Sequence, residues 1–402
     1  MRRRALEASL VASVAASLTL AFGSAVQRAE AQQPPLKIGV LLPMSGILAP
    51  LGTEQLNGMR IAVEEAGGAV AGRKIDLLVE DTEAKPDVGL AKARKLVLSD
   101  RVDIMSGVVS SAVALAVAPY TSSQKLPLVI SNASTNVLSG EKCDRYVIRA
   151  AYSSAQVGGP IGPYMARKGI KTAFILASDY IAPHEYVTAF KESFIAAGGK
   201  VVGEAFPPFN KTQDYGPYIS QARAANPDAI FAVFYGGEAI LFMKQYEAFG
   251  IKDKLPVYTS MGLVPQMLHK AQGVAAAGVT ASLNYVPELS TAENKKFVAI
   301  YQDRHKTLPA EFAVMGYDAL RFIVEAVKAR NGDTKDKDAL VTALEKVSYN
   351  GPRGPMRIEP NTRGATQNVY IARTVEKGGE ISFEILETLP DFKDPVPGCV
   401  LK

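Results

Sequence analysis

The stretch LKIGVLL at residues 36–42 decides the class of fold. It is a short, mostly apolar run between Pro35 and a loop that contains Pro43 and Gly46, which predicts a strand buried in a sheet. We expect a helix at about residues 53–66 and a second strand at 74–80. Strands separated by helices of this length form βαβ units, in which the strands lie parallel.

The same alternation of strands and helices continues along the chain. Further strands are expected at 102–105, 128–131, 172–177, 200–205, 228–235 and 255–260, and further helices at 87–98, 111–124, 156–168, 183–197, 215–225 and 237–249. Helices at 291–306, 311–330 and 336–346 follow, with short extended pieces at 355–359 and 369–373. The sequence therefore predicts an α/β fold with two parallel-sheet sets in series, and late helices that pack back on one of them.

The composition is that of a globular protein. The chain has 402 residues, of which 48% are hydrophobic and 21% charged, and its formal net charge is +5. A nucleic-acid-binding protein would gather Lys and Arg on one face or in one tail, and this chain has no run of five like charges. We therefore expect no nucleic-acid partner. No segment after residue 31 approaches 18 uninterrupted apolar residues, so we expect a soluble mature chain, and we expect it to be a monomer.

The first 31 residues have the order of an export signal. Arginines at positions 2–4 precede a soft apolar stretch at residues 10–26, and Ala29-Glu30-Ala31 supplies small residues for cleavage. The stretch is rich in Ala and Ser and at the short limit for spanning a bilayer, which disfavours the alternative of a membrane anchor. The paired arginines leave the twin-arginine route open. We predict cleavage after Ala31 and a mature chain in a bacterial periplasm.

The two cysteines invite pairing in an oxidising compartment. Cys143 precedes an apolar run, and Cys399 lies near the end of a Pro-rich tail at residues 389–402. A disulfide between them would hold this tail against the body of the protein, whereas the alternative is two unpaired thiols. Metal or redox chemistry is not expected of them, because the chain has no CxxC motif.

Polar loops follow two neighbouring strands of the first set. Ser110 and Ser111 come after one strand, and residues 131–135 (SNAST) come after the next. Such loops meet at the carboxyl edge of a doubly wound sheet, where helix N-termini favour anions. A carboxylate site is one interpretation, and ordinary helix capping by Ser and Thr is the other.

The corresponding loops of the second set are richer in aromatic residues. Tyr152, Tyr180 and Tyr235 could line a cleft and contact an apolar or aromatic ligand. The alternative is that some of them are core tyrosines, and His184 near Tyr180 is more typical of a surface or capping position.

Motifs for catalysis and cofactor binding are missing from the sequence. There is no GxxxxGK[ST] loop, no GxGxxG after residues 36–42, no GxSxG and no HExxH. His184, His269 and His305 share no metal-ligand spacing. We therefore expect neither an enzyme nor a metal or cofactor.

Several short motifs together resemble one family of proteins. These are residues 38–46, Leu51-Gly52 with Asn57-Gly58, residues 72–77 with Glu80-Asp81, residues 178–180, 196–199 and 225–229, and Gly316-Tyr317-Asp318-Ala319. In this order they resemble the Leu/Ile/Val-binding type of periplasmic solute-binding protein, over about residues 36–385. The resemblance implies two Rossmann-like lobes joined by crossovers near residues 150–154, 283–287 and 356–359, which close on a ligand and deliver it to an ABC permease.

The resemblance also implies the limits of the lobes and the residues of the site. The N-terminal lobe would comprise residues 36–152 plus 285–357, and the C-terminal lobe 153–284 plus 358–388. Ser110 and Thr135 would hold a ligand carboxylate, supported by Val109, Ala133 and Ser134. The remaining ligand-binding residues would be Leu51, Ser111, Tyr152, Tyr180, Ala182, Tyr235 and Met261.

Two positions depart from the pattern of amino-acid-binding members. Met261 stands where those members carry an acidic residue for the ammonium group, and Leu51 stands where an aromatic side chain is frequent. An unpartnered buried ammonium would cost on the order of several kcal/mol. The departures favour an aromatic acid as ligand, while Glu238 could supply the charge and keeps amino acids as an alternative. A sensor that presents its ligand to a membrane receptor is a further alternative.

Overall fold

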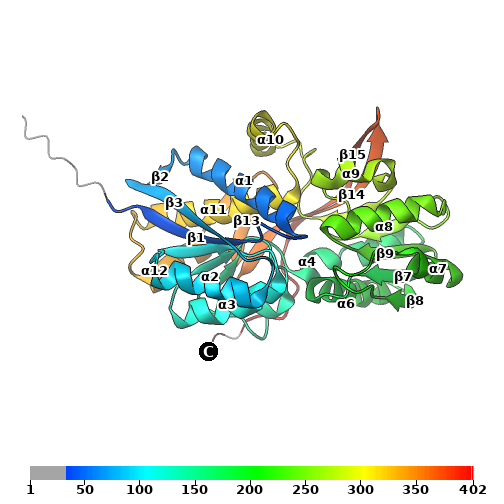
Figure 1. The fold of residues 1–402 in the computed structure, drawn as a ribbon, viewed down its shortest axis with the longest axis horizontal. Helices are drawn as coiled ribbons and strands as arrows, with labels where there is room; N and C mark the ends of the chain where they lie inside the picture. The colour runs from blue at the N-terminus through cyan, green and yellow to red at the C-terminus, as the bar shows by residue number, and fades with distance from the viewer. Residues whose placement is uncertain (1–32, 400, 402) are drawn as a thin grey trace, which may run out of the picture. The chain divides into compact units, whose positions relative to one another are not determined.

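Five parallel strands and one short antiparallel strand form the first part of the sheet. The computed structural model describes residues 33–399 and 401; the predicted export signal lies outside them. The strands are β1 (Leu36–Leu42), β2 (Ala69–Val70), β3 (Arg73–Asp81), β4 (Ile104–Gly107), β5 (Leu128–Ile130) and β6 (Val147–Arg149), in the order β2-β3-β1-β4-β5-β6. β1 pairs with β3 on one side and β4 on the other, so the apolar stretch 36–42 lies in the middle of its sheet (Figure 1).

A second set of parallel strands follows in the chain. It comprises β7 (Thr172–Ala177), β8 (Lys200–Ala205), β9 (Ala229–Val233), β10 (Val257–Thr259) and β11 (Thr280–Leu283), in the order β11-β10-β9-β7-β8. Every residue of β9 is buried, as a parallel strand covered on both faces requires. The predicted α/β class with mostly parallel sheets is confirmed.

One long strand, β14 (Gly364–Lys377), connects the two sets. Gly364 pairs in parallel with Arg149 of β6, while Tyr370–Arg373 pair antiparallel with β11. The chain therefore passes between the sets within β14. β12 (Ser348–Gly351) and β13 (Gly354–Glu359), where a crossover was expected at residues 356–359, form a hairpin that pairs with β14.

β14 continues into β15 (Glu380–Phe392), with which it forms a long antiparallel hairpin. The sequence analysis did not predict β11 or β15. The four residues at 389–392, assigned to the Pro-rich tail, are the end of β15.

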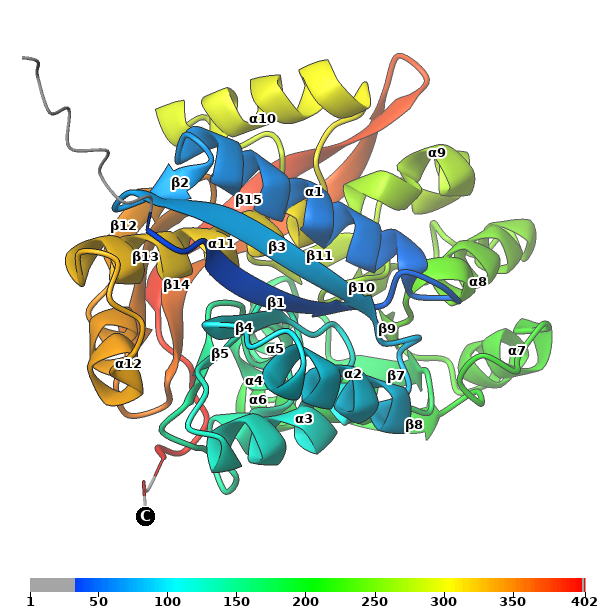
Figure 2. The ribbon, with the colours of Figure 1, turned by 60° about the vertical axis from the view of Figure 1, so that its left-hand side comes forward.

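Helices cover both faces of the first part of the sheet. α1 (Ala49–Glu65) packs against α11 (Glu311–Ala329) on one face, and α2 (Pro86–Leu98) packs against α3 (Ser111–Ser123) on the other (Figure 2). α10 (Ala292–His305) and α12 (Lys337–Glu345) lie beside α1 and α11. The late helices thus pack back on the first set of strands, as expected.

The second set of strands carries α4 (Ser154–Gly158), α5 (Ile161–Arg167), α6 (Ile181–Ala196), α7 (Gly216–Ala224), α8 (Gly236–Ala248) and α9 (His269–Gln272). A single helix was predicted at 156–168, but the structure has α4 and α5, with Pro160 between them. Proline lacks the backbone N–H that a continuous helix would need and clashes with the preceding turn, which accounts for the break. Among the described residues, no helix is long and apolar enough to cross a membrane.

Two glycines allow α1 and α11 to approach at backbone distance. A Cβ atom on Gly58 would lie 1.8 Å from the carbonyl oxygen of Ala313, and one on Gly316 would lie 2.1 Å from that of Gln55. No larger residue fits at this crossing without moving a helix. Both glycines belong to the motifs on which the family resemblance rests.

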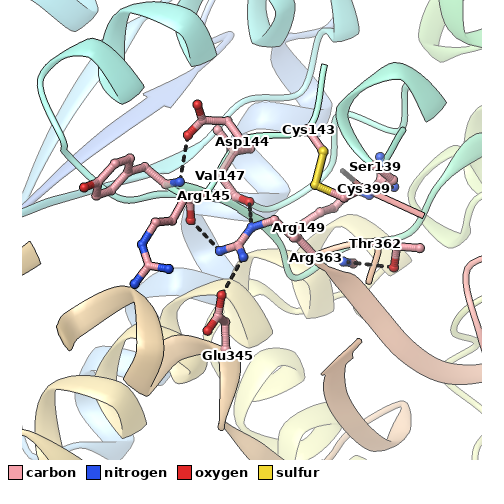
Figure 3. Close-up of a disulfide and its surroundings, with 12 residues drawn as sticks. Ser139, Cys143, Asp144, Arg145, Val147, Arg149, Glu345, Thr362, Arg363 and Cys399 are labelled. Atoms are coloured by element: carbon pink, nitrogen blue, oxygen red, sulfur yellow. Dashed lines mark hydrogen bonds and ion pairs between the residues drawn. A yellow bond between two sulfur atoms is a disulfide. The ribbon is translucent and has the colours of Figure 1, made fainter. Parts of the chain in front are cut away.

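The C-terminal tail is anchored to the first set of strands. Cys143 and Cys399 form a disulfide across 256 residues (Figure 3). Nearby, Arg149 and Asp394 form a buried ion pair at 2.7 Å, and Asp394 also accepts a hydrogen bond from the Ser153 hydroxyl. The tail is therefore held both covalently and by a charged contact to the segment that leaves β6.

Candidate ligand-binding pocket

A small, nearly filled pocket, with a cavity volume of about 30 Å³, lies where the carboxyl ends of the two sets of strands face each other. Its residues come from loops and helix starts after β1, β4, β5, β6, β7, β8 and β9. They are Leu48, Leu51, Val109, Ser110, Ser111, Asn132, Ser134, Tyr152, Tyr180, Ala182, Tyr186, Phe209 and Tyr235. This is the edge at which open α/β folds bind ligands, and the side chains that line it fill most of the space between the two sets.

One polar region of the pocket is the N-terminus of α3. Ser110 is the N-cap residue, and its hydroxyl accepts a long hydrogen bond of 3.4 Å from the backbone N–H of Val113. The same hydroxyl lies 2.8 Å from the Tyr180 hydroxyl, which belongs to the loop before α6. The N–H groups of Ser111 and Ala112, at the start of α3, also lie near the Tyr180 hydroxyl. Partly positive helix-terminal groups and a serine hydroxyl thus converge on one oxygen atom.

A second polar region is a group of tyrosine hydroxyls. Tyr186 is fully buried, and its hydroxyl lies near those of Ser134, Tyr152 and Tyr235. Among the described residues it has no hydrogen-bond partner of ordinary geometry. Burial raises the pKa of Tyr186 to about 12 and those of Tyr152 and Tyr235 well above the usual value. All three phenols therefore stay protonated at neutral pH and can donate to an oxygen or an anion.

Aromatic and aliphatic side chains form the walls between these polar groups. The Phe209 ring stacks on Tyr180 with a centroid distance of 5.0 Å. Glu238, which is 4% exposed, holds the Phe209 loop by accepting a hydrogen bond of 2.7 Å from the backbone N–H of Asn210. It also accepts one from the Ser178 hydroxyl. Glu238 therefore stabilises a loop, and it is not among the pocket-lining residues.

Most of the residues proposed from the sequence line the pocket. These are Leu51, Val109, Ser110, Ser111, Ser134, Tyr152, Tyr180, Ala182 and Tyr235. Three do not line it. Ala133 is buried in the core beside α3, and Met261 is fully buried in the core of the second set of strands.

Thr135 is the third residue that does not line the pocket. Its hydroxyl donates a hydrogen bond of 2.6 Å to the Glu185 carboxylate, which also accepts one of 2.9 Å from the N–H of Asn136. A carboxylate of the protein itself thus uses the hydroxyl that was expected to bind the ligand. Burial raises the pKa of Glu185, although these hydrogen bonds oppose the shift.

Four lining residues were not proposed from the sequence. Asn132 lies in the polar loop at residues 131–135, Leu48 directly precedes α1, and Tyr186 lies one helical turn beyond Ala182 on α6. Helical spacing could have found Tyr186. Phe209 had no comparable signal, because it reaches the pocket from a loop after the edge strand β8.

Charged side chains do not contribute to the described lining of the pocket. The described residues also contain no group of three or more His, Cys, Asp or Glu side chains arranged to hold a metal ion. Recognition here must rest on hydroxyls, backbone N–H groups and apolar contact.

The fold and the position of the pocket define a class of protein. A family model described as "Periplasmic binding protein" matches residues 35–380, and the chain belongs to this family, with the type I fold. It is similar to the Leu/Ile/Val-binding protein homolog 6 of Brucella melitensis, with 29% identity over 99% of each chain. The chain is thus a substrate-binding protein of an ABC transporter in the Leu/Ile/Val group, which implies an extracytoplasmic location and a permease partner.

Two solved structures from Rhodopseudomonas palustris are also similar to it. One is a solute-binding protein of strain BisB5 in complex with 3,4-dihydroxybenzoic acid, with 32% identity, 90% of this chain and 99% of that chain covered and a TM-score of 0.86. The other, in complex with benzoate, has 32% identity, 91% and 100% coverage and a TM-score of 0.85.

Proposed function

We propose that this protein captures a small aromatic carboxylate in the pocket and delivers it to an ABC permease as a monomer, without catalysing a reaction. The two sets of strands would be lobes with the limits inferred from the sequence, at residues 36–152 plus 285–357 and 153–284 plus 358–388. The lobes would close on the ligand by a hinge motion. Export with cleavage after Ala31 belongs to this proposal, and mass spectrometry of the exported chain should find Gln32 as its first residue.

The observation that carries the proposal is the lack of an acidic side chain among the described lining residues. An α-amino acid would bury an ammonium group there without a carboxylate partner, which costs several kcal/mol. The position where amino-acid-binding members carry the acidic residue is Met261, which is uncharged and lies in the core. The Glu238 carboxylate holds the Phe209 loop, so it does not supply that partner either.

The groups that are present suit an aromatic acid. The N-terminus of α3 and the Ser110 hydroxyl can hold a carboxylate by charge-assisted hydrogen bonds. The rings of Tyr152, Tyr180 and Phe209 can contact an aromatic body. The two R. palustris neighbours, with benzoate and 3,4-dihydroxybenzoic acid bound, support this class of ligand.

Isothermal titration calorimetry on the mature protein tests the proposal. We expect benzoate or 4-hydroxybenzoate to bind, and leucine and phenylalanine not to bind at the same concentrations. Ser110→Ala should weaken binding of the acid by roughly 1.5–3 kcal/mol, the range for a hydrogen bond to a charged group. Ser123→Ala, an exposed site on the same helix, is the matched control. Binding of the amino acids alone would refute the aromatic-acid assignment and leave the transport class intact.

A further inference from the structure

The Tyr180 hydroxyl lies where the proposed function places a ligand oxygen. It is 2.8 Å from the Ser110 hydroxyl, and the N–H groups of Ser111 and Ala112 lie near it. The first turn of α3, all of which the structure describes, contains no acidic residue. The N-terminal groups of α3 therefore have a neutral phenol oxygen where an anion would be more strongly held.

The contact between Ser110 and Tyr180 also joins the two sets of strands. Ser110 follows β4 of the first set, and Tyr180 follows β7 of the second. A second approach lies nearby, where a Cβ on Gly236 at the start of α8 would be 2.9 Å from the carbonyl oxygen of Ile47. The two sets thus meet here through this side-chain hydrogen bond and a close backbone approach, and Thr135 and Asn136 add hydrogen bonds to Glu185 of α6.

A separate feature of the pocket indicates that it accepts a further polar group. The Tyr186 hydroxyl is fully buried and, within the described chain, lacks a hydrogen-bond partner of ordinary geometry. Leaving such a group unpaired is unfavourable, so a ligand oxygen that reaches it would gain a hydrogen bond. In the pocket, the Tyr180 hydroxyl therefore occupies a position that suits a ligand oxygen, and the Tyr186 hydroxyl is a donor without a partner of ordinary geometry among the described residues.

From these contacts we infer that the Tyr180 hydroxyl is an internal substitute for the ligand carboxylate: it helps to hold the two lobes together before the ligand binds, and the carboxylate must displace it. This inference rests on the proposed function. Both Tyr180 and the ligand compete for the same N–H groups and the Ser110 hydroxyl. The carboxylate prevails because hydrogen bonds to a charged acceptor are roughly twice as strong as those to a neutral one. Tyr180 thereby limits the affinity for the acid and keeps part of the ligand-free population closed.

The variant Tyr180→Phe tests this, because it keeps the ring and its stacking on Phe209 and removes only the hydroxyl. Tyr215→Phe is the matched control: Tyr215 is buried away from the pocket lining, and its hydroxyl has no partner among the described residues. Two quantities are measured, the Kd for benzoate by calorimetry and the radius of gyration without added ligand by small-angle X-ray scattering.

We expect Tyr180→Phe to bind benzoate about two- to tenfold more tightly than the wild type, the factor for one neutral hydrogen bond that no longer has to be broken. Its radius of gyration without ligand should exceed that of the wild type, and Tyr215→Phe should change neither quantity. Weaker binding by Tyr180→Phe would overturn the inference and make Tyr180 a direct ligand contact. An unchanged Kd and radius would overturn it as well.

The same experiment separates this inference from the proposed function. If neither the wild type nor the variant binds benzoate or 4-hydroxybenzoate, the assignment of the ligand class is wrong and displacement by a carboxylate is refuted. The scattering comparison still decides whether the Tyr180 hydroxyl holds the lobes together.

Discussion

Single residues in this protein show how strongly burial controls protonation. Glu311, at the start of α11, is 3% exposed, and one of its carboxylate oxygens has no hydrogen-bond partner among the described residues. Burial, with a smaller effect of the nearby Glu54 carboxylate, raises the pKa of Glu311 to about 8. In the unfolded chain the same group titrates near 4.5.

This shift predicts a loss of stability as the pH rises. A carboxyl group whose folded pKa exceeds its unfolded pKa contributes its full stability below about 4.5, and this contribution is lost as the pH rises toward 8. The difference is on the order of 3–5 kcal/mol. We expect Glu311→Gln to remove most of this dependence, which urea unfolding at pH 5 and pH 8 would measure. The exposed Glu293→Gln is the control, and a dependence that persists unchanged in Glu311→Gln would contradict the assignment.

Thr135 gives a second prediction at this scale. Since its hydroxyl donates to Glu185 and not into the pocket, Thr135→Val should lower the free energy of unfolding by about 1–2 kcal/mol. The Kd for the ligand should stay within about twofold of the wild-type value. Urea unfolding and calorimetry would measure the two quantities, and loss of binding with unchanged stability would restore the role expected from the sequence.

The residues of the site were predictable to different degrees. Ser110 and Tyr180 follow apolar strands directly, and loops after parallel strands meet at one edge, so their convergence could be inferred. The partner of Thr135 could not, because Glu185 lies 50 residues further along the chain and on another lobe-forming set of elements. Contacts of this kind depend on the relative position of the two sets, which no local pattern encodes.

Two glycines set how closely the helices α1 and α11 approach each other. Gly58 and Gly316 lie where α1 and α11 cross at backbone distance. Replacing a helical glycine by alanine favours the helix by up to about 1 kcal/mol, whereas overpacking costs about 1–3 kcal/mol. At a separation of 1.8 Å from a backbone oxygen the cost is at the upper end, because a helix must move.

We therefore expect Gly58→Ala to lower the free energy of unfolding by about 2 kcal/mol. Arg60→Ala, at an exposed position of the same helix, is the control. Thermal and urea unfolding would measure the change. If Gly58→Ala were as stable as Arg60→Ala, the close crossing of α1 and α11 would not constrain position 58.

The elements themselves were largely predictable from apolar periodicity. The helices at 181–196, 292–305 and 311–329 lie within two residues of their expected limits. β15 was missed although Ile381, Phe383 and Ile385 alternate with polar residues, a period that is typical of a half-buried strand. Its structure depends on pairing with β14, a non-local interaction.

At the scale of the whole molecule, the disulfide between Cys143 and Cys399 closes a loop of 256 residues. Cross-links over long loops stabilise mainly by restricting the unfolded chain, typically by about 2–4 kcal/mol. The double variant Cys143→Ser/Cys399→Ser should be less stable by that amount while Asp394 and Arg149 still hold the tail. Urea unfolding with and without dithiothreitol provides the check. We expect dithiothreitol to lower the free energy of unfolding of the wild type but not that of the double variant. Identical urea-unfolding curves for all samples would contradict this prediction.

The class of fold followed from the alternation of strands and helices, but the connection between the two sets did not. β14 pairs with β6 at one end and with β11 further along. The sequence showed only a short extended piece at residues 369–373, because half of the strand is polar and its pairing is long-range.

The anchored tail also fixes the order in which the molecule can assemble. The first set of strands lacks its covering helix α11, its neighbour β14 and the disulfide partner of Cys143 until residues 311–399 have been made. The earliest part of the chain to emerge is therefore the last to be completed. A chain that crosses a membrane from its N-terminus must therefore cross almost entirely before its first set of strands can acquire all its partners. Loss of the segment that contains Cys399 would leave this set without its disulfide.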